Sequence, residues 1–273
     1  MKKLKKLLVF FGILSLGLSL TACGNKEAQK DTWADIDKKK EVVIGFDDSF
    51  VPMGFKDESG KNVGFDIDLA NAVFAKYGIK VKMQPIDWSM KEAELKNGRI
   101  DLIWNGYSVT AGRKRVVLFS KPYMINDQVL VTKKSSKIKK VSQMTNKKLG
   151  VQEGSSGFDD FEMEPEVLKD IVFMNEATTY EGFNEALLDL KSNRIDGLLI
   201  DQVYAQYYLS KNKEIDDYNI IKTPYMQENF AVGARKGDKT LINNINKEIE
   251  ELHDNGKFQE ISNKWFHKDV YPN

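Results

Sequence analysis

Arg113 and Asp201 are the side chains best suited to recognise a ligand that carries both charges. Arg113 ends the segment Trp104-Asn105-Gly106-Tyr107-Ser108-Val109-Thr110-Ala111-Gly112-Arg113, which starts as an apolar strand and enters a turn. A guanidinium group can hold a carboxylate through two parallel hydrogen bonds. Asp201 follows the apolar run Leu198-Leu199-Ile200, where a carboxylate could receive an ammonium group. Taken alone, Arg113 could also be a surface arginine, and Asp201 could merely cap a helix starting at Gln202.

Serine residues near these two positions could assist the same binding. The hydroxyl group of Ser108 can bond to either end of a zwitterion. Gly154-Ser155-Ser156-Gly157 follows an expected strand at 149–151 and should open a helix. Backbone amides at the start of a helix form an anion site, and simple capping of the helix is compatible with that role.

Sets of residues that carry out catalysis are scarce. The two histidines, His253 and His267, lie in helical and exposed contexts near the C-terminus, and Cys23 is the only cysteine. The chain has no zinc-protease, phosphate-loop or dinucleotide-binding motif. Asp66-Ile67-Asp68 lacks the rest of a calcium loop and indicates the start of a helix. We therefore expect no metal, no cofactor and no enzymatic activity.

The pattern of apolar residues predicts alternating strands and helices. A β-branched run at 42–46 and a second one at 81–84 indicate strands, and a helix is expected from Asp66 to Tyr77. Ser89-Met90-Lys91-Glu92 has the form of a capping box, so another helix should start there. This alternation is typical of an α/β fold with a largely parallel sheet.

A weak internal repeat predicts two similar lobes. Leu95-Lys96-Asn97-Gly98-Arg99-Ile100-Asp101 resembles Leu190-Lys191-Ser192-Asn193-Arg194-Ile195-Asp196, at a spacing of 95 residues. A second similarity pairs Val43-Ile44-Gly45 with Leu149-Gly150-Val151. Chance similarity of turn chemistry is the alternative explanation.

Extended segments at 128–133, 218–223 and 229–234 suggest where the chain crosses between the lobes. Lobe 1 should comprise residues 41–132 and 225–273, completed by helices at 239–256 and 257–266, and lobe 2 should comprise 133–224. Two crossings would make a hinge, with a ligand cleft between the lobes.

The first residues indicate export. A lysine-rich start is followed by an apolar stretch of 14 residues, Leu7 to Leu20, interrupted by two glycines and two serines, which is too short for a membrane-spanning helix. Leu20-Thr21-Ala22-Cys23 then resembles a bacterial lipobox, which implies a signal peptide at 1–22 and a lipid on Cys23. An ordinary secretory signal ending near Ala22 is the alternative. Residues 23–40 would form a polar tether, and the protein would face the extracellular side or the periplasm.

Charge excludes another class of partner. Removal of residues 1–22 takes away four lysines and no acids, which leaves 37 basic and 40 acidic side chains, a net charge of −3. A nearly neutral chain argues against nucleic acid as a partner. With no second cysteine, an internal disulfide is excluded, so stability must come from packing.

Together these motifs resemble the polar amino-acid substrate-binding proteins of ABC importers, the family of glutamine-, histidine- and lysine/arginine/ornithine-binding proteins. The matching segments are 50–52, 64–69, 98–102, 106–113, 119–123, 154–157 and 194–201, in family order along the chain. The resemblance implies a two-lobe, periplasmic-binding-protein-like (type II) fold. It also implies a free L-amino acid as ligand and a partner permease, and we expect the protein to act as a monomer.

The resemblance also assigns roles. Arg113 would grip the ligand carboxylate with Ser156, and Asp201 would receive the ammonium group beside Ser108 and the Gly106 carbonyl. The whole implied site consists of Asp47, Phe50, Trp88, Asn105, Gly106, Ser108, Arg113, Gln152, Ser155, Ser156 and Asp201. The family's usual Thr-Asp-Glu-Arg turn is here Thr110-Ala111-Gly112-Arg113.

The expected ligand is arginine. Phe50 and Trp88 could sandwich a flat cation, and Asp47 could pair with it at the end of the pocket. Glutamine is the main alternative, because Asp47 could accept an amide instead, and lysine and cystine follow. A cyclohexadienyl-type dehydratase on the same scaffold is a remote alternative, for which Glu153 would be the candidate base.

Overall fold

The structure is a computed structural model and describes residues 30–272. The expected signal peptide, lipidated Cys23 and the first part of the expected tether lie outside the described residues. Among those that are described, no helix is long and apolar enough to cross a membrane.

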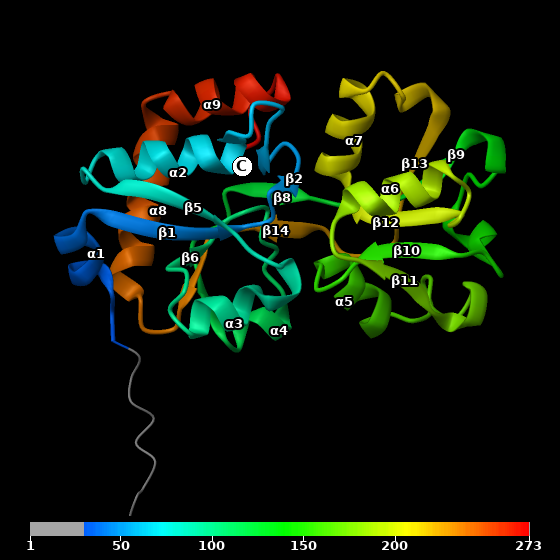
Figure 1. Cartoon of the computed structure of the whole chain (residues 1–273), viewed down its shortest axis with the longest axis horizontal. Coiled ribbons are helices and arrows are strands. Elements are labelled where there is room, and N and C mark those ends of the chain that lie inside the picture. The colour runs from blue at the N-terminus through cyan, green and yellow to red at the C-terminus, as the bar shows by residue number, and fades with distance from the viewer. Residues whose placement is uncertain (1–29, 273) are drawn as a thin grey trace, which may run out of the picture. The chain divides into compact units, whose positions relative to one another are not determined.

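One half of the fold is built on a five-stranded sheet in the order β5-β1-β6-β15-β7 (Figure 1). Its strands are β1 (Glu41–Phe46), β5 (Lys80–Pro85), β6 (Leu102–Ile103), β7 (Val117–Phe119) and β15 (Gly233–Arg235). Strands β5, β1 and β6 are parallel, and β15 runs antiparallel to both of its neighbours. The helices of this half are α2 (Phe65–Ala75), α3 (Lys91–Lys96), α4 (Ala111–Lys114), α8 (Lys239–Asp254) and α9 (Lys257–Phe266).

The other half repeats this plan with the order β11-β10-β12-β9-β13. Its strands are β9 (Gln128–Lys133), β10 (Leu149–Gln152), β11 (Ala177–Tyr180), β12 (Gly197–Asp201) and β13 (Tyr218–Lys222). Three strands are again parallel, and the fourth, β9, is antiparallel to both of its neighbours. The helices are α5 (Ser156–Met163), α6 (Phe183–Lys191) and α7 (Gln202–Lys211).

Side-chain alternation explains how each sheet is covered on both faces. In β12, Leu198 and Ile200 pack into the cluster that holds α6 and α7. Leu199, between them, packs on the opposite face with Phe161 of α5. Because every second residue of a strand points to the same face, a continuous apolar run predicts a strand buried on both sides.

Short elements complete the chain. They are a small sheet of β2 (Ser49–Phe50), β3 (Gly54–Lys56) and β4 (Asn62–Val63), a pair formed by β8 (Met124–Asn126) and β14 (Glu228–Phe230), and single 3-10 turns at Trp88–Met90, Lys134–Ser136, Val141–Met144, Phe173–Asn175 and Ile215–Asp217. Strand β8 pairs with β14 where the chain passes between the two halves, so the expected pair of crossings is present.

The internal repeat is structural, although its second part is shifted by one residue. Asp101 accepts a hydrogen bond from the Val43 amide, and Asp196 accepts the same bond from the Lys148 amide. Ile44 lies opposite Leu102 and Leu149 opposite Gly197, which makes Ile44 the counterpart of Leu149. Our expected pairing of 43–45 with 149–151 is therefore wrong by one position, because register is set by strand pairing rather than by local similarity.

Two expected boundaries also differ. All of β9 pairs within the second sheet, which therefore begins at Gln128 rather than after residue 132. The extended segment at 229–234 is two strands, β14 and β15, that belong to different sheets. Ala231 and Val232 lie between the two strands and belong to neither, and the continuous apolar run gives no sign of this break.

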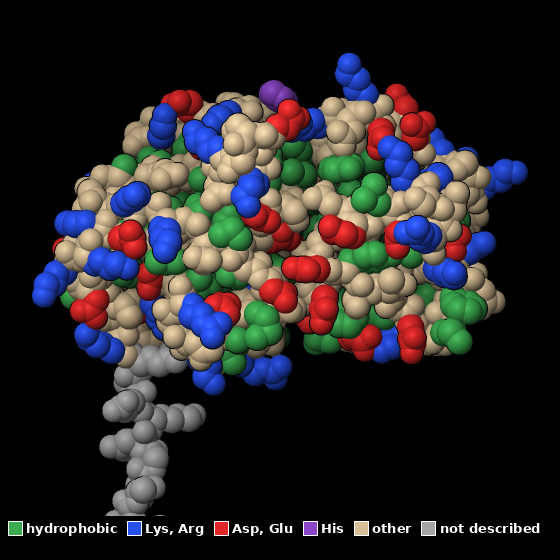
Figure 2. Space-filling view, viewed as in Figure 1, with side chains coloured by type: hydrophobic (Ala, Val, Ile, Leu, Met, Phe, Trp, Pro, Cys, Tyr) green, Lys and Arg blue, Asp and Glu red, His purple; other side chains and the backbone are tan. Residues whose placement is uncertain are grey.

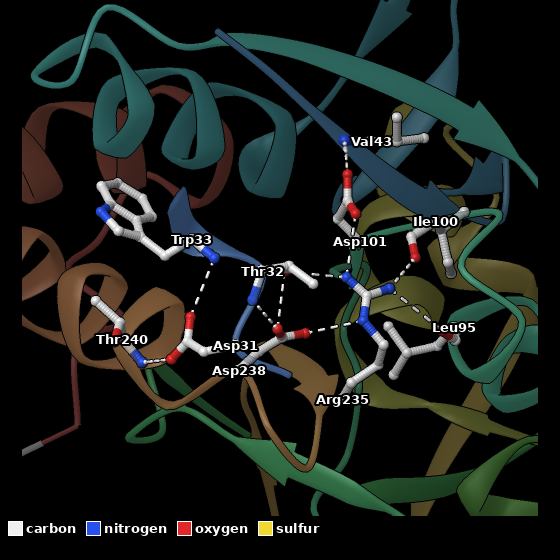
Figure 3. Close-up of polar contacts among 10 residues, drawn as sticks. All are labelled: Asp31, Thr32, Trp33, Val43, Leu95, Ile100, Asp101, Arg235, Asp238 and Thr240. Carbon is white, nitrogen blue, oxygen red and sulfur yellow. Dashed lines mark hydrogen bonds and ion pairs between the residues drawn. The ribbon is translucent and has the colours of Figure 1, made fainter. Parts of the chain in front are cut away.

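The last part of the expected tether is a helix, α1 (Trp33–Lys39). Ile36 is buried, and the Trp33 ring packs edge-on against Tyr77 at 4.8 Å between centroids. The amide and hydroxyl groups of Thr32 donate to Asp238 (Figure 3). Two apolar residues three positions apart are enough to hold one helical turn against a core, although the rest of the segment is polar.

Figure 3 shows how this helix is joined to the sheet through Arg235. The Arg235 side chain forms ion pairs with Asp101 and Asp238 and donates to the backbone carbonyl of Ile100 at 2.7 Å. It also donates to the hydroxyl of Thr32. One arginine at the end of β15 thus connects the start of α1 to the Arg-Ile-Asp turn of the first repeat.

Candidate functional site

The predicted site residues surround one small cavity between the two halves. Its walls are Asp47, Phe50, Trp88, Asn105, Gly106, Arg113, Gln152, Ser155, Ser156 and Asp201. Ser108, the remaining predicted residue, lies behind this wall and accepts a hydrogen bond from the Ser156 hydroxyl at 3.1 Å. The space that the walls leave is about 10 Å³, roughly enough for one water molecule, so the two halves lie nearly closed on each other here.

Arg113 lines the cavity and is almost fully buried. Thr110 caps α4 by accepting from the Arg113 amide, so the turn forms with the unusual Ala111-Gly112 pair. The guanidinium group donates to the carbonyl of Ser108 and, across the halves, to that of Gly154, both at 3.0 Å. A guanidinium has five N–H donors, so these bonds fix its plane and leave donors for a carboxylate.

The start of α5 lies beside Arg113. The Ser155 hydroxyl accepts from the Phe158 amide at 3.1 Å, which makes Ser155 the expected cap. Both Ser155 and Ser156 line the cavity and are buried. The first amides of a helix lack partners within the helix and carry a partial positive charge, so the part of the cavity beside Ser155 and Ser156 favours an anion.

Asp201 also lines the cavity and is buried. Its Oδ1 atom accepts from Asn126 at 2.7 Å and from Gln128 at 3.0 Å. Its side chain makes no capping bond to α7, so the interpretation of Asp201 as a simple helix cap is wrong. Burial raises the pKa of Asp201 well above the usual value, and the nearby charge of Glu228 raises it further. Such a carboxyl group gains from a cation placed beside it.

Asp47 forms part of the third wall with a carboxylate that is only partly used. Its Oδ1 atom accepts from the amide and the hydroxyl of Ser49, and its Oδ2 atom accepts from Gln152 across the halves at 2.8 Å. The Asp47 amide donates to Asn105, which fixes the loop. Burial raises the pKa of Asp47. A carboxylate has about four acceptor positions, so one on Oδ2 is left for a donor in the cavity.

Phe50 and Trp88 line the cavity, each packed against different partners. The Phe50 ring lies 5.9 Å from Phe183 and 5.6 Å from Tyr204, both of the opposite half. Trp88 instead packs edge-on against Tyr107 at 5.9 Å. Phe50 therefore joins the two halves as well as lining the cavity.

Gly106 allows Phe50 to approach the backbone closely. It has a positive φ of 57°, and a Cβ atom there would lie 2.7 Å from the Phe50 ring. Its amide donates to Asp66 at 2.7 Å, and the Tyr123 hydroxyl donates to the same oxygen at 3.0 Å. Full burial raises the pKa of Asp66 to about 7.

Asp66 was expected only as a helix start. Gly64 is the N-cap instead, and the carboxyl group of Asp66 faces the core and holds Gly106. Asp66 lies in the segment 64–69, which matches the family, but its interpretation as the start of a helix gave no indication that its side chain is buried.

Lys91 is a buried cation that sequence reasoning missed. Its ammonium group donates to the Trp88 carbonyl and, across the halves, to the Gly154 carbonyl at 2.8 Å. Burial and, to a smaller extent, the charge of Arg113 lower its pKa to about 8. The expected capping box is wrong, because Asp87 rather than Ser89 caps this turn. A lysine inside an apparent surface helix gives no sequence signal of burial.

The remaining candidates lie away from the cavity lining. His267 is exposed, whereas His253 is half-buried and stacks on Tyr271 with 3.9 Å between ring centroids. Glu153, the candidate base of a dehydratase, is exposed. Within residues 30–272 there is no group of three His, Cys, Asp or Glu side chains that could hold a metal ion.

Comparisons with known proteins agree with one another. The family model of the bacterial extracellular solute-binding proteins, family 3, matches residues 42–268. A histidine-bound substrate-binding protein of an ABC uptake transporter from Streptococcus pneumoniae is 57% identical, with a TM-score of 0.88, over 89% of this chain and 99% of that one. An ancestral arginine-binding protein with bound arginine is 35% identical, with a TM-score of 0.76, over 83% of this chain and 98% of its own. The arginine-binding extracellular protein ArtP of Bacillus subtilis is 28% identical over 96% of this chain and 98% of its own.

Proposed function

Since the chain belongs to the bacterial extracellular solute-binding proteins of family 3, we propose that its cavity binds a free L-amino acid for an ABC importer. The expected two-lobe, type II periplasmic-binding-protein fold is confirmed. The relatives named above are binding proteins of transport systems or amino-acid-binding proteins. One observation carries the proposal: Arg113 and Asp201 lie in one small cavity whose walls come from both lobes.

The cavity lining offers a partner for each of the two charges shared by all amino acids. The guanidinium of Arg113, with the first amides of α5, would hold the carboxylate. The carboxyl group of Asp201 would hold the ammonium group, assisted by the Ser108 hydroxyl and the Gly106 carbonyl. A buried ion pair of this kind is worth most when both groups are fully bonded, and both anchors are already fixed by hydrogen bonds.

For the side chain we propose a flat group that carries N–H donors, with histidine first and arginine second. Asp47 has an acceptor position left on Oδ2, and Phe50 supplies an aromatic wall. Histidine is favoured by the histidine bound to the relative that is 57% identical. Arginine, our expectation from the sequence, is supported by the named specificity of ArtP at 28% identity.

Binding would close the two lobes about the crossings at β8 and β14. The lobes already touch through hydrogen bonds from Gln152 to Asp47, from Arg113 to Gly154 and from Ser156 to Ser108. A ligand held by both lobes favours this closed arrangement, which a permease can distinguish from an open one. Since one chain supplies both halves of the site, a monomer suffices.

The same proposal includes the membrane. Cys23 would carry a lipid after removal of residues 1–22, which would keep the receptor at the outer face of the cell membrane. Metabolic labelling with a radioactive fatty acid tests this directly. Wild-type protein should take up label, and Cys23→Ser should take up none.

The ligand is tested by a thermal-shift screen of the common amino acids, cystine and ornithine, followed by calorimetry. Histidine, arginine or both should raise the melting temperature. Arg113→Ala should weaken binding at least about 30-fold, since it leaves a buried carboxylate without its partner. Arg115→Ala is the matched control, because Arg115 is exposed in the same turn. Equal affinity in wild type and Arg113→Ala would contradict the assigned site.

A further inference from the structure

Glu228 lies beside Asp201, the proposed partner of the ammonium group, and the sequence gave it no role. It is on β14, the strand by which the chain returns to the first lobe, and it is only 9% exposed. Its Oε2 atom accepts from the Ser108 hydroxyl at 3.1 Å, from Asn126 at 3.0 Å and from Gln128 at 3.1 Å. A buried acid with three donors on one oxygen is a built part of the site rather than a surface charge.

Two side-chain amides join Glu228 to Asp201. The Asn126 nitrogen donates to both acids, and so does the Gln128 nitrogen. An amide nitrogen has two N–H bonds, so each amide is fully used by the pair. The amides themselves are held, because the Asn126 oxygen accepts from the Val203 amide. The two carboxyl groups are therefore fixed close together by neutral donors.

Neutral donors do not balance two negative charges in a buried place. The cation in this part of the site is Arg113, which donates to the carbonyls of Ser108 and Gly154. The other ionisable groups facing Glu228 are the acids Asp159 and Asp160 of α5, which add repulsion. Two such carboxyl groups cannot both remain ionised without a further cation, so one of them keeps a proton.

We propose that Glu228 is a positioning residue of the ammonium site, which makes Asp201 exchange a proton for the ammonium group of the ligand. This inference rests on the proposed function. In the ligand-free protein, Asp201 holds a proton because Glu228 stands beside it. When the ammonium group arrives between lobe 2 and the hinge strands, its charge replaces the proton, which leaves for solvent. Binding of the ammonium group thus depends on pH and on the crossing strands, which carry Asn126 and Glu228.

Calorimetry of histidine or arginine binding, in two buffers of different ionisation enthalpy, measures the protons released. The wild type should release up to about one proton per ligand near neutral pH, and its affinity should fall as the pH is lowered. Glu228→Gln should reduce this release at least about twofold and weaken binding about tenfold above pH 8, because a neutral amide lets Asp201 ionise and attracts the ammonium group less. The ligand's own protons cancel in the difference between the two proteins.

Three variants separate charge from folding. Glu228→Asp keeps the charge and should restore much of the proton release. Asp127→Asn, a half-buried acid in the same crossing, should leave the release unchanged. When Asp160→Asn is present in both proteins, Glu228→Gln should still lower the number of protons released, because those protons come from Asp201.

The outcomes also separate this inference from the proposed function. If the wild type binds no amino acid, the proposed function fails. If the wild type binds, and Glu228→Gln melts cooperatively and releases as many protons as the wild type, the role given to Glu228 is wrong. If Glu228→Gln does not fold, Glu228→Asp decides: it should keep most of the wild type's proton release, and a loss of the release would contradict the role given to Glu228.

Discussion

At the level of single residues, burial places ionisable groups where their charged forms are costly. Burial raises the pKa values of Asp47, Asp66 and Asp201 and lowers that of Lys91. Each group has hydrogen-bond partners that fix its direction, but few have an opposite charge in contact. A zwitterion supplies both missing charges at once, which is a physical reason for the cavity to prefer amino acids over neutral molecules.

Asp66 offers a test of this cost without any ligand. Its pKa is about 7 in the folded protein, above the usual 3.8, so the folded state holds the proton more tightly. The stabilisation from this group is complete below about pH 4 and is lost as the pH rises through about 7. Asp66→Asn cannot ionise and keeps an oxygen for Gly106 and Tyr123. Its free energy of unfolding, relative to wild type, should increase by about 2–3 kcal/mol between pH 5 and 8.

Denaturant unfolding at several pH values measures this difference. Asp216→Asn is the matched control, since Asp216 is exposed, and it should give a constant offset from wild type. Parallel stability curves for wild type and Asp66→Asn would show that Asp66 is already ionised when folded.

At the level of elements, the repeat explains what the sequence could predict. Local patterns identified the strands β1, β5, β9, β10 and β12 and the helices α2, α8 and α9, because hydrophobic period and turn residues are local properties. The break between β14 and β15 and the full membership of β9 in the second sheet depend on which strand each residue pairs with, and no local pattern carries that information.

The same distinction applies to the candidate site. Strand and turn signals marked Arg113, Ser156 and Asp201 as candidates, and the family resemblance assigned them to one site. Lys91 and Glu228 gain their positions only from contacts across the lobes and crossings, at Gly154 and Asn126. Their roles follow from burial, which single-sequence patterns do not give for charged residues.

Helix α1 tests an element that the sequence suggested was a tether. Ile36 is buried in the core of lobe 1. Ile36→Ala should lower the free energy of unfolding by about 2–4 kcal/mol, because it leaves a cavity under the helix. Ligand affinity should change less than about twofold, since α1 does not line the binding cavity. Lys38→Ala, on the exposed face of α1, should change neither quantity. If Ile36→Ala had the same free energy of unfolding as wild type, α1 would contribute nothing to the stability of the fold.

At the level of the whole molecule, contacts between the lobes fall into two kinds. Some come from residues that line the cavity, such as Asp47 with Gln152. Others lie outside the lining, such as Lys91 with Gly154. Figure 2 shows acidic side chains along the junction of the lobes, which favours the approach of cationic ligands. Contacts of the first kind can distinguish ligands, whereas those of the second kind can only favour closure.

This distinction leads to a prediction for Lys91→Met. Methionine keeps an unbranched apolar side chain but loses the bond to the Gly154 carbonyl, so the closed arrangement becomes less favourable. A ligand's apparent affinity falls with the fraction of protein that can close, whatever the ligand is. Histidine and arginine should therefore both bind about tenfold more weakly, because a hydrogen bond to a charged group is worth ~1.5–3 kcal/mol, and the ratio of their affinities should stay constant.

Asp47→Asn provides the contrast, because Asp47 lines the cavity beside the proposed side-chain position. It should change the ratio of histidine to arginine affinity, measured by calorimetry on the same two ligands. Small-angle scattering of ligand-free Lys91→Met should give a larger radius of gyration than wild type, as an open pair of lobes requires. If Lys91→Met instead altered the affinity ratio while scattering stayed constant, Lys91 would contact the ligand directly, and the separation of closure from recognition would not hold.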